Sequence, residues 1–241
     1  MFPQALLARL VLLGLMGLHR LPADANAGEP EPDSAYAVLR NELTAQYTLL
    51  IQAKQYEQAT EIAQETLRVV EQMFGPDHPN TAQVLNDFGY LSRVQGKDAQ
   101  AVLLHQRALR IREQAFGPED AALVQSLNNL AKSYLALGRD DEAEPLFKRS
   151  LPILEKQLGP DQPRVAEVLD RLGLIYTRQG RAAEAEPLFT RALAIVERYP
   201  GSTAPELVTV LEDYAACLRT LGKLHDAEAL EARAKGLGAT R

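Results

Sequence analysis

Hydrophobic residues recur along most of the chain at spacings of three and four positions, the pattern of helices with one buried face. The same columns return every 42 residues, which indicates a repeat array. In the first half of each repeat, the columns are Leu85, Leu127, Leu169 and Leu211, with Leu43 extending them backwards, and Gly89, Ala131, Gly173 and Ala215. In the second half they include Ala59, Ala101, Ala143, Ala185 and Ala227. Each repeat is therefore predicted to be a pair of helices whose small residues allow close approach.

Two glycine columns punctuate this pattern. The first consists of Gly75, Gly117, Gly159 and Gly201, and the second of Gly96, Gly138, Gly180 and Gly222. A glycine in the second column can take the left-handed conformation that ends one helix and turns into the next. The first repeat has Lys54 at this position, so we expect its turn to be the least regular.

These signals predict an all-α solenoid of about five antiparallel helix pairs. The expected pairs cover residues 34–53 and 56–73, 79–95 and 98–115, 121–137 and 140–157, 163–179 and 182–198, and 204–221 and 224–236. We expect one repeat domain at 34–237, preceded by a polar linker at 28–33, with no stretch left over for a catalytic domain.

The first 27 residues have a different character. An apolar run at 10–18 is much shorter than the roughly 20 residues that a membrane span requires. Ala25 and Ala27 supply small residues for a cleavage site, with an alternative site ending at Ala25. We therefore expect a secretory signal peptide at 1–27, a periplasmic or secreted protein in a bacterium, and no membrane insertion after its removal. An uncleaved helix or a wrong start codon is the alternative interpretation.

Composition and motif content argue against nucleic-acid binding and against catalysis. The formal net charge is −6, which argues against nucleic acid as the main partner. The chain contains one cysteine, Cys217, so no intramolecular disulfide can form, and its apolar surroundings favour a buried hydrophobe over a nucleophile. The four histidines have no carboxylate or cysteine at ligand spacing, and no metalloprotease or phosphate-loop motif occurs. We predict a non-enzymatic protein without a metal or cofactor.

The repeat resembles the tetratricopeptide repeat (TPR), and its length and motifs resemble the kinesin-light-chain-type subfamily. The motifs are Phe-Gly-Pro-Asp-His-Pro at 74–79, Leu-Asn-Asn-Leu-Ala at 127–131 and Ala-Glu-Pro-Leu-Phe at 143–147 and 185–189. The resemblance covers about residues 34–236 and implies a right-handed superhelical solenoid that acts as a protein-interaction scaffold. The proline that is usual at the end of the second helix is absent, and Glu71, Glu113, Glu155 and Glu197 stand there.

The resemblance also implies that a peptide or partner helix binds in a concave groove lined by the first helices. Outward positions beside the leucine column would contact it, and Asn86 and Asn128 are the strongest candidates because an amide can bond a peptide backbone in both directions. The predicted groove residues are Asn86, Tyr90, Arg93, Gln125, Asn128, Asn129, Lys132, Asp170, Arg171 and Arg178. The alternative for each residue is an ordinary solvated helix face.

Two other features bear on partners. Arg107, Arg149, Arg191 and Arg233 form a basic column, which could bind an acidic polymer but is expected to pair with the glutamate column of the neighbouring repeat. The last repeat has no following helix to cover Ala227, Leu230 and Ala234, so self-association through this end is the alternative to a scaffold. An unrecognised enzyme is the least favoured interpretation.

Overall fold

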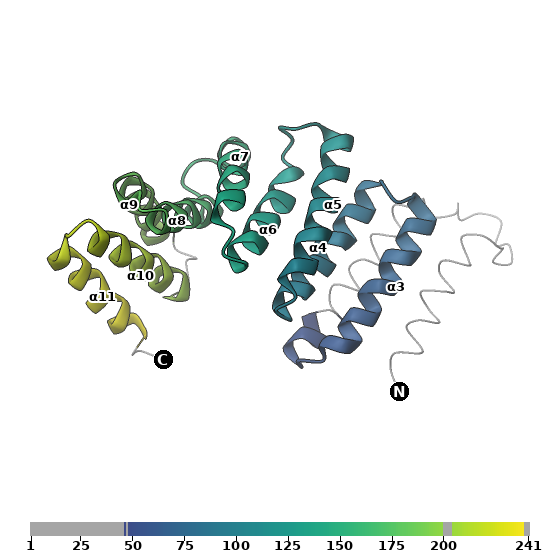
Figure 1. The fold of residues 1–241 in the computed structure, drawn as a ribbon, viewed down its shortest axis with the longest axis horizontal. Helices are drawn as coiled ribbons and strands as arrows, with labels where there is room; N and C mark the ends of the chain where they lie inside the picture. The colour runs from purple at the N-terminus through teal and green to yellow at the C-terminus, as the bar shows by residue number, and fades with distance from the viewer. Residues whose placement is uncertain (1–45, 47, 200–203, 239–241) are drawn as a thin grey trace, which may run out of the picture. The chain divides into compact units, whose positions relative to one another are not determined.

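The computed structural model describes residues 46, 48–199 and 204–238, and within these ranges every regular element is a helix. Their bounds are α3 (Tyr56–Phe74), α4 (Pro79–Val94), α5 (Asp98–Phe116), α6 (Leu123–Ala136), α7 (Asp140–Leu158), α8 (Pro163–Arg178), α9 (Ala182–Arg198), α10 (Ala204–Thr220) and α11 (Leu224–Gly238) (Figure 1). The all-α class and the last four predicted helix pairs are confirmed, whereas the first helix predicted at 34–53 lies mostly outside the described residues. The predicted signal peptide, the linker, Leu43 and Gly201 lie outside the described residues.

The chain divides into two compact units, residues 1–115 and 116–241. In the first unit, α4 packs against α3 through a cluster of Ala59, Ala63, Phe88 and Leu91, and against α5 through Ala82, Leu85, Ala108 and Ile111. In the second unit, α6, α8 and α10 are the first helices of three pairs, and α7, α9 and α11 are the second helices. The leucine column is at most 1% exposed, and the alanine column Ala59 to Ala227 is fully buried.

Small residues in the first helices are required by the rings that pack on them. A Cβ atom placed on Gly89 would lie 2.4 Å from the His105 ring, and one placed on Gly173 would lie 2.8 Å from the Phe189 ring. The prediction that this column allows close approach of the two helices in a pair is therefore confirmed.

The turn glycines have the predicted left-handed backbone. Gly96, Gly138, Gly180 and Gly222 have φ values of 72°, 69°, 76° and 75°. Lys54 has φ 56°, and the hydrogen bond from the Gln55 amide to the Leu50 carbonyl corresponds to that from Lys97 to Ser92. The expectation of an irregular first turn is wrong, because the backbone hydrogen bonds hold a lysine in the conformation that glycine takes elsewhere.

Lys54→Gly is therefore expected to stabilise the chain by about 1 kcal/mol. Removing the side chain from the left-handed region gains roughly 1–2 kcal/mol, and the greater flexibility of glycine in the unfolded chain offsets part of this gain. Urea unfolding of the full chain measures the change. Lys97→Gly is the matched control, because Lys97 follows its turn glycine and has no positive φ; it should give no gain. An equal gain in both variants would contradict the explanation.

The arginine column pairs with the glutamate column, as predicted. Arg107, Arg191 and Arg233 approach Glu71, Glu155 and Glu197 of the preceding repeat at 2.6 Å. Arg107, Arg149 and Arg191 also donate to the carbonyls of Pro76, Pro118 and Pro160 at 2.8–3.0 Å. These guanidinium groups hold the Gly-Pro loop of one repeat against the second helix of the next.

The last helix pair covers its own apolar residues. Ala227 is fully buried and Ala234 is 3% exposed, and Leu230 packs on the cluster formed by Ala215, Leu218 and Ala227. The expectation that Ala227 and Ala234 form an uncovered end is wrong, because α10 already covers them.

Candidate functional site

The polar residues that follow the leucine column are buried, and two of them contact the second helix of their own pair. Asn86 is fully buried, Asn128 is 8% exposed and Asp170 is 2% exposed. The expectation that they point outward is wrong. One residue step along a helix turns a side chain by only about 100°, so a neighbour of a buried leucine can still face the second helix of the pair.

Two of the three have a matched partner on the second helix. In the first unit, Oδ1 of Asn86 lies 3.2 Å from Nδ1 of His105 on α5. Burial, with the nearby Arg93 charge, lowers the pKa of His105 to about 4, so the neutral ring donates from Nδ1 to the amide oxygen. In the second unit, the Ser150 hydroxyl on α7 donates to Oδ1 of Asn128 at 2.6 Å.

Asp170 has no such partner. In the repeat that contains Asp170, the position equivalent to His105 holds Phe189, and the position equivalent to Ser150 holds Ala192. Neither side chain carries a hydrogen-bond donor. Oδ1 of Asp170 is buried without a hydrogen bond, and Oδ2 lies 3.9 Å from Nε of Arg171, beyond hydrogen-bond distance. Burial therefore raises the pKa of Asp170 to about 7, with repulsion from Asp213 adding to it and Arg171 opposing it.

Asp213 lies on α10, which packs against α8. Its side chain is half-buried, and burial raises its pKa against the opposing charges of Arg171 and Arg178. Two carboxyl groups with raised pKa values thus lie near each other on adjacent first helices of the second unit.

The other predicted groove residues are more accessible. In the first unit, Tyr90 is 46% exposed, and the Arg93 guanidinium lies 5.6 Å from the centre of its ring. In the second unit, Gln125 and Asn129 are half-buried on α6, and Lys132 of α6 pairs with Glu167 of α8. Arg178 is exposed and reaches Asp140 at the start of α7 at 3.4 Å.

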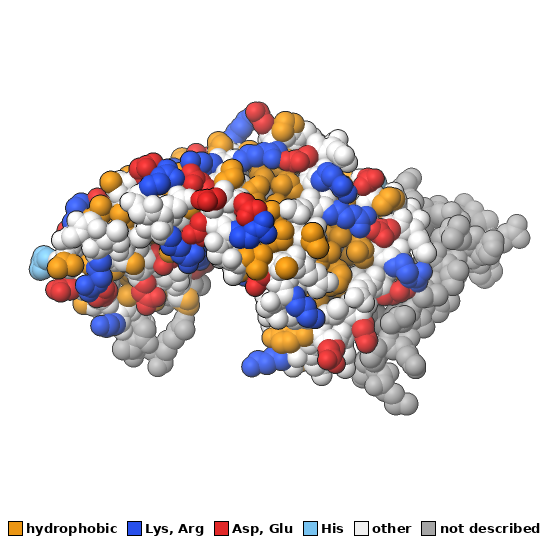
Figure 2. Space-filling view, viewed as in Figure 1, with side chains coloured by type: hydrophobic (Ala, Val, Ile, Leu, Met, Phe, Trp, Pro, Cys, Tyr) orange, Lys and Arg blue, Asp and Glu red, His pale blue; other side chains and the backbone are white. Residues whose placement is uncertain are grey.

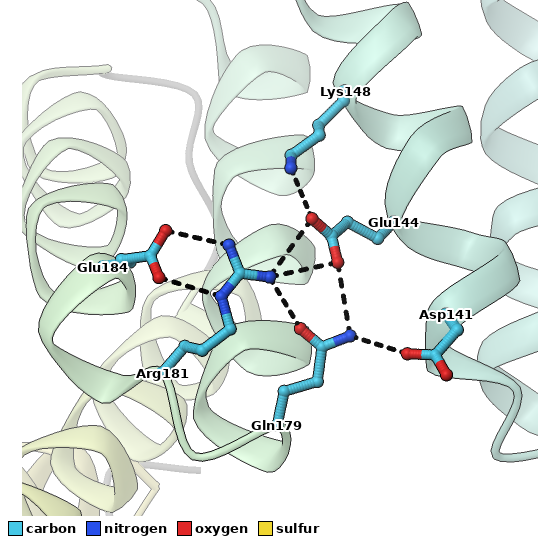
Figure 3. A network of polar contacts seen from close by, with 6 residues as sticks. All are labelled: Asp141, Glu144, Lys148, Gln179, Arg181 and Glu184. Atoms are coloured by element: carbon cyan, nitrogen blue, oxygen red, sulfur yellow. Dashed lines mark hydrogen bonds and ion pairs between the residues drawn. The ribbon is translucent and has the colours of Figure 1, made fainter.

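A polar network that sequence reasoning missed joins α7 to the turn between α8 and α9. Arg181 donates to both oxygens of Glu184 and of Glu144, and to the side-chain oxygen of Gln179 (Figure 3). Its guanidinium also lies 4.0 Å from the centre of the Tyr176 ring. Lys223 makes the equivalent contact with Glu186 at 2.6 Å. The signal was a basic residue directly after each turn glycine, repeated every 42 residues: Lys97, Arg139, Arg181 and Lys223.

Among the described residues, no group of three or more His, Cys, Asp or Glu side chains could hold a metal ion, and no helix is long and apolar enough to cross a membrane. Cys217 is fully buried and donates to the Ala182 carbonyl at 3.4 Å, and burial raises its pKa, so it is the expected core residue. On the face drawn in Figure 2, acidic and basic side chains are interspersed.

The tetratricopeptide repeat family model matches residues 48–114, 90–156, 120–195 and 164–235, which together span most of the chain. The chain belongs to the tetratricopeptide repeat family. A comparison with curated protein sequences finds no match. The resemblance at sequence level is therefore confirmed for the family, and TPR proteins are generally non-enzymatic scaffolds for protein–protein interaction.

Solved structures with the same TPR fold include three informative cases. The crystal structure of BtubC (BKLC) from P. vanneervenii has a TM-score of 0.78 at 19% identity, covering 100% of this chain and 92% of that one. A kinesin-light-chain-like protein of Podosopora anserina with nearly identical TPR-like repeats has a TM-score of 0.70 at 19% identity, covering 83% of this chain and 95% of that one. MamA has a TM-score of 0.56 at 12% identity, covering 80% and 95%. At these identities the likeness concerns the fold alone.

Proposed function

We propose that this TPR protein is an exported, non-enzymatic scaffold that binds a peptide or partner helix against its first helices. The observation that carries the proposal is the exposed Tyr90 on α4, with the Arg93 guanidinium over its ring. Tyrosine and arginine are the residue types that dominate binding hot spots, and neither is needed to fill the core here. Stacked helix pairs curve with their first helices on the concave side, where a ligand is enclosed.

In the second unit, the first helices α6 and α8 are joined by the Lys132–Glu167 ion pair. Asn129, Lys132 and Arg171 are half-buried there, so part of each side chain faces solvent. These groups supply donors for the carbonyl groups of an extended peptide. The binding surfaces that we propose thus consist, within each unit separately, of the accessible members of the predicted set, because Asn86, Asn128 and Asp170 are buried.

Site-specific photocrosslinking tests this surface. The full chain would carry p-benzoylphenylalanine in place of Tyr90, or in place of Leu103, which is 68% exposed on the second helix α5. Crosslinks to a foreign protein from position 90 and not from 103 are the expected result. Crosslinks from position 103 alone would place the partner on the second helices, and crosslinks only between copies of this chain would favour self-association.

Export is part of the same proposal and rests on the apolar run and small residues within 1–27. Expression of the full sequence with fractionation of the cells, followed by mass spectrometry of the intact protein, would test it. The expected product lies outside the cytoplasm and begins at residue 28, or at residue 26 if cleavage follows Ala25. A cytoplasmic product that retains residue 1 would contradict export.

A further inference from the structure

We propose that Asp170 and Asp213 form a subsite for one cationic side chain of the bound peptide, a lysine ammonium or an arginine guanidinium. This inference rests on the proposed binding of a peptide against the first helices and names the chemistry that one part of this surface recognises.

The first step is the unsatisfied oxygen of Asp170. Buried polar groups in native proteins nearly always have a hydrogen-bond partner, and each exception requires an explanation. The equivalent residues in the two preceding pairs, Asn86 and Asn128, have partners in His105 and Ser150. In the next repeat, an acid, Asp170, replaces the amide, and the second helix of the same repeat has no donor at the equivalent positions. Folding alone would favour a neutral residue there, so we infer that the carboxyl group serves a ligand.

The second step is the charge around Asp170. On its own helix it faces Arg171 and Glu167, and from α10 it faces Asp213. Glu167 is already paired with Lys132 of α6, and Asp213 in turn faces Arg171, Arg178 and Glu212. Arg178 also contacts Asp140. Both carboxyl groups therefore feel the positive charge of Arg171, which makes no hydrogen bond to Asp170. A second cation, brought by the peptide, would supply the hydrogen bonds and charge that these two groups lack.

The third step concerns the kind of cation. Two carboxyl groups are too few for a metal site, and no larger set of ligands gathers there among the described residues. An ammonium or guanidinium group brings the N–H donors that Asp170 lacks. Asp213 is half-buried and the Arg171 side chain is 30% exposed, so the cation contacts Asp213 from solvent and takes the place of Arg171 beside Asp170.

A proton-linkage signature follows from this geometry. Burial holds the pKa of Asp170 at about 7, so near pH 6 this carboxyl group is mostly protonated in the free protein. A bound cation favours the ionised form, so binding near pH 6 should release up to about one proton per peptide. Binding to an exposed carboxylate that is already ionised would release none.

The experiment uses the full chain and a synthetic peptide library. The central residue is fixed as Lys, Arg, norleucine or Glu, the flanking positions are randomised, and affinity is measured by fluorescence anisotropy. We expect the Lys and Arg pools to bind at least about tenfold more tightly than the norleucine pool, the effect of one good charge pair. Asp170→Asn and Asp213→Asn should each reduce this preference to about threefold or less, whereas Asp161→Asn, at an exposed loop position, should preserve it.

Calorimetry of the Lys pool in buffers with different ionisation enthalpies measures the released protons. Proton release that disappears in Asp170→Asn supports the subsite. Ala192→Ser, which places a hydroxyl donor opposite Asp170, should reduce the release while the carboxyl group remains. Equal binding of all pools, no binding, or a cation preference unchanged in Asp170→Asn would overturn the proposal. If one of these three outcomes is found but position 90 still crosslinks to a foreign protein, the cation subsite is wrong and the proposed function stands.

Discussion

Replacing Asp170 with asparagine is expected to raise the free energy of unfolding at pH 8 by up to about 4 kcal/mol. The figure follows from a pKa that burial raises from 3.8 to about 7, at about 1.4 kcal/mol for each pH unit. Asparagine keeps the shape of the protonated acid and removes the charge. The column already contains asparagine at Asn86 and Asn128, so the backbone accepts it at this position.

The pH dependence has a defined sign. Below about pH 4, Asp170 is protonated in both the folded and the unfolded chain, and the acid costs nothing. As the pH rises from about 4 to about 7, the unfolded chain loses this proton while the folded chain retains it, so stability falls. Urea unfolding of the wild type and of Asp170→Asn at several pH values should therefore show a difference that is small near pH 4 and largest above pH 7. A difference independent of pH would contradict this explanation.

Ala192→Ser separates the missing donor from the charge. Ser150, 42 residues earlier, already donates to Asn128 at 2.6 Å, so a hydroxyl group at position 192 is expected to donate to Asp170. The pKa of Asp170 should fall and stability at pH 8 should rise. Ala108→Ser is the matched control, because Ala108 is equally buried and Asn86 already has its partner in His105. This control should destabilise the chain at every pH.

His105 contributes the opposite pH dependence, and it lies in the first unit. Its pKa is lowered to about 4 in the folded chain, so the contribution of the neutral ring to the free energy of unfolding is fully present above about pH 6.5. This contribution is lost as the pH falls toward 4. The two effects partly cancel in the wild-type profile between these limits. The test of Asp170 must therefore compare variants at each pH, because the wild-type curve alone reports their sum.

The sequence predicted the features that repeat. The 42-residue columns located the helices, the turn glycines and the arginine–glutamate pairs, because a contact made once per repeat leaves a mark once per repeat. The burial of Asn86, Asn128 and Asp170 was missed because a polar residue beside a buried leucine looks the same whether it faces solvent or a donor on the second helix. The unsatisfied acid emerged only from the structure, which shows that Oδ1 of Asp170 is buried without a hydrogen bond.

Phe189→Ala is expected to destabilise the chain by about 3–5 kcal/mol, the usual cost of truncating a fully buried aromatic ring. The ring is fully buried on α9, lies against Gly173 of α8, and stacks on Tyr214 of α10 with ring centres 5.7 Å apart. It therefore joins three helices of the second unit. Leu103→Ala, which truncates a residue that is 68% exposed, should change stability by less than about 0.5 kcal/mol.

A double-mutant cycle with Gly173→Ala tests whether the ring determines the glycine. In the wild type the added methyl group would lie 2.8 Å from the Phe189 ring, so Gly173→Ala should destabilise the chain. In Phe189→Ala the ring is gone, and the same substitution should stabilise it by about 1 kcal/mol, because alanine favours a helix more than glycine does and fills part of the cavity. Urea unfolding of the four proteins measures this reversal of sign. Additive effects would show that helix packing tolerates the methyl group, and the small-residue column would then need another cause.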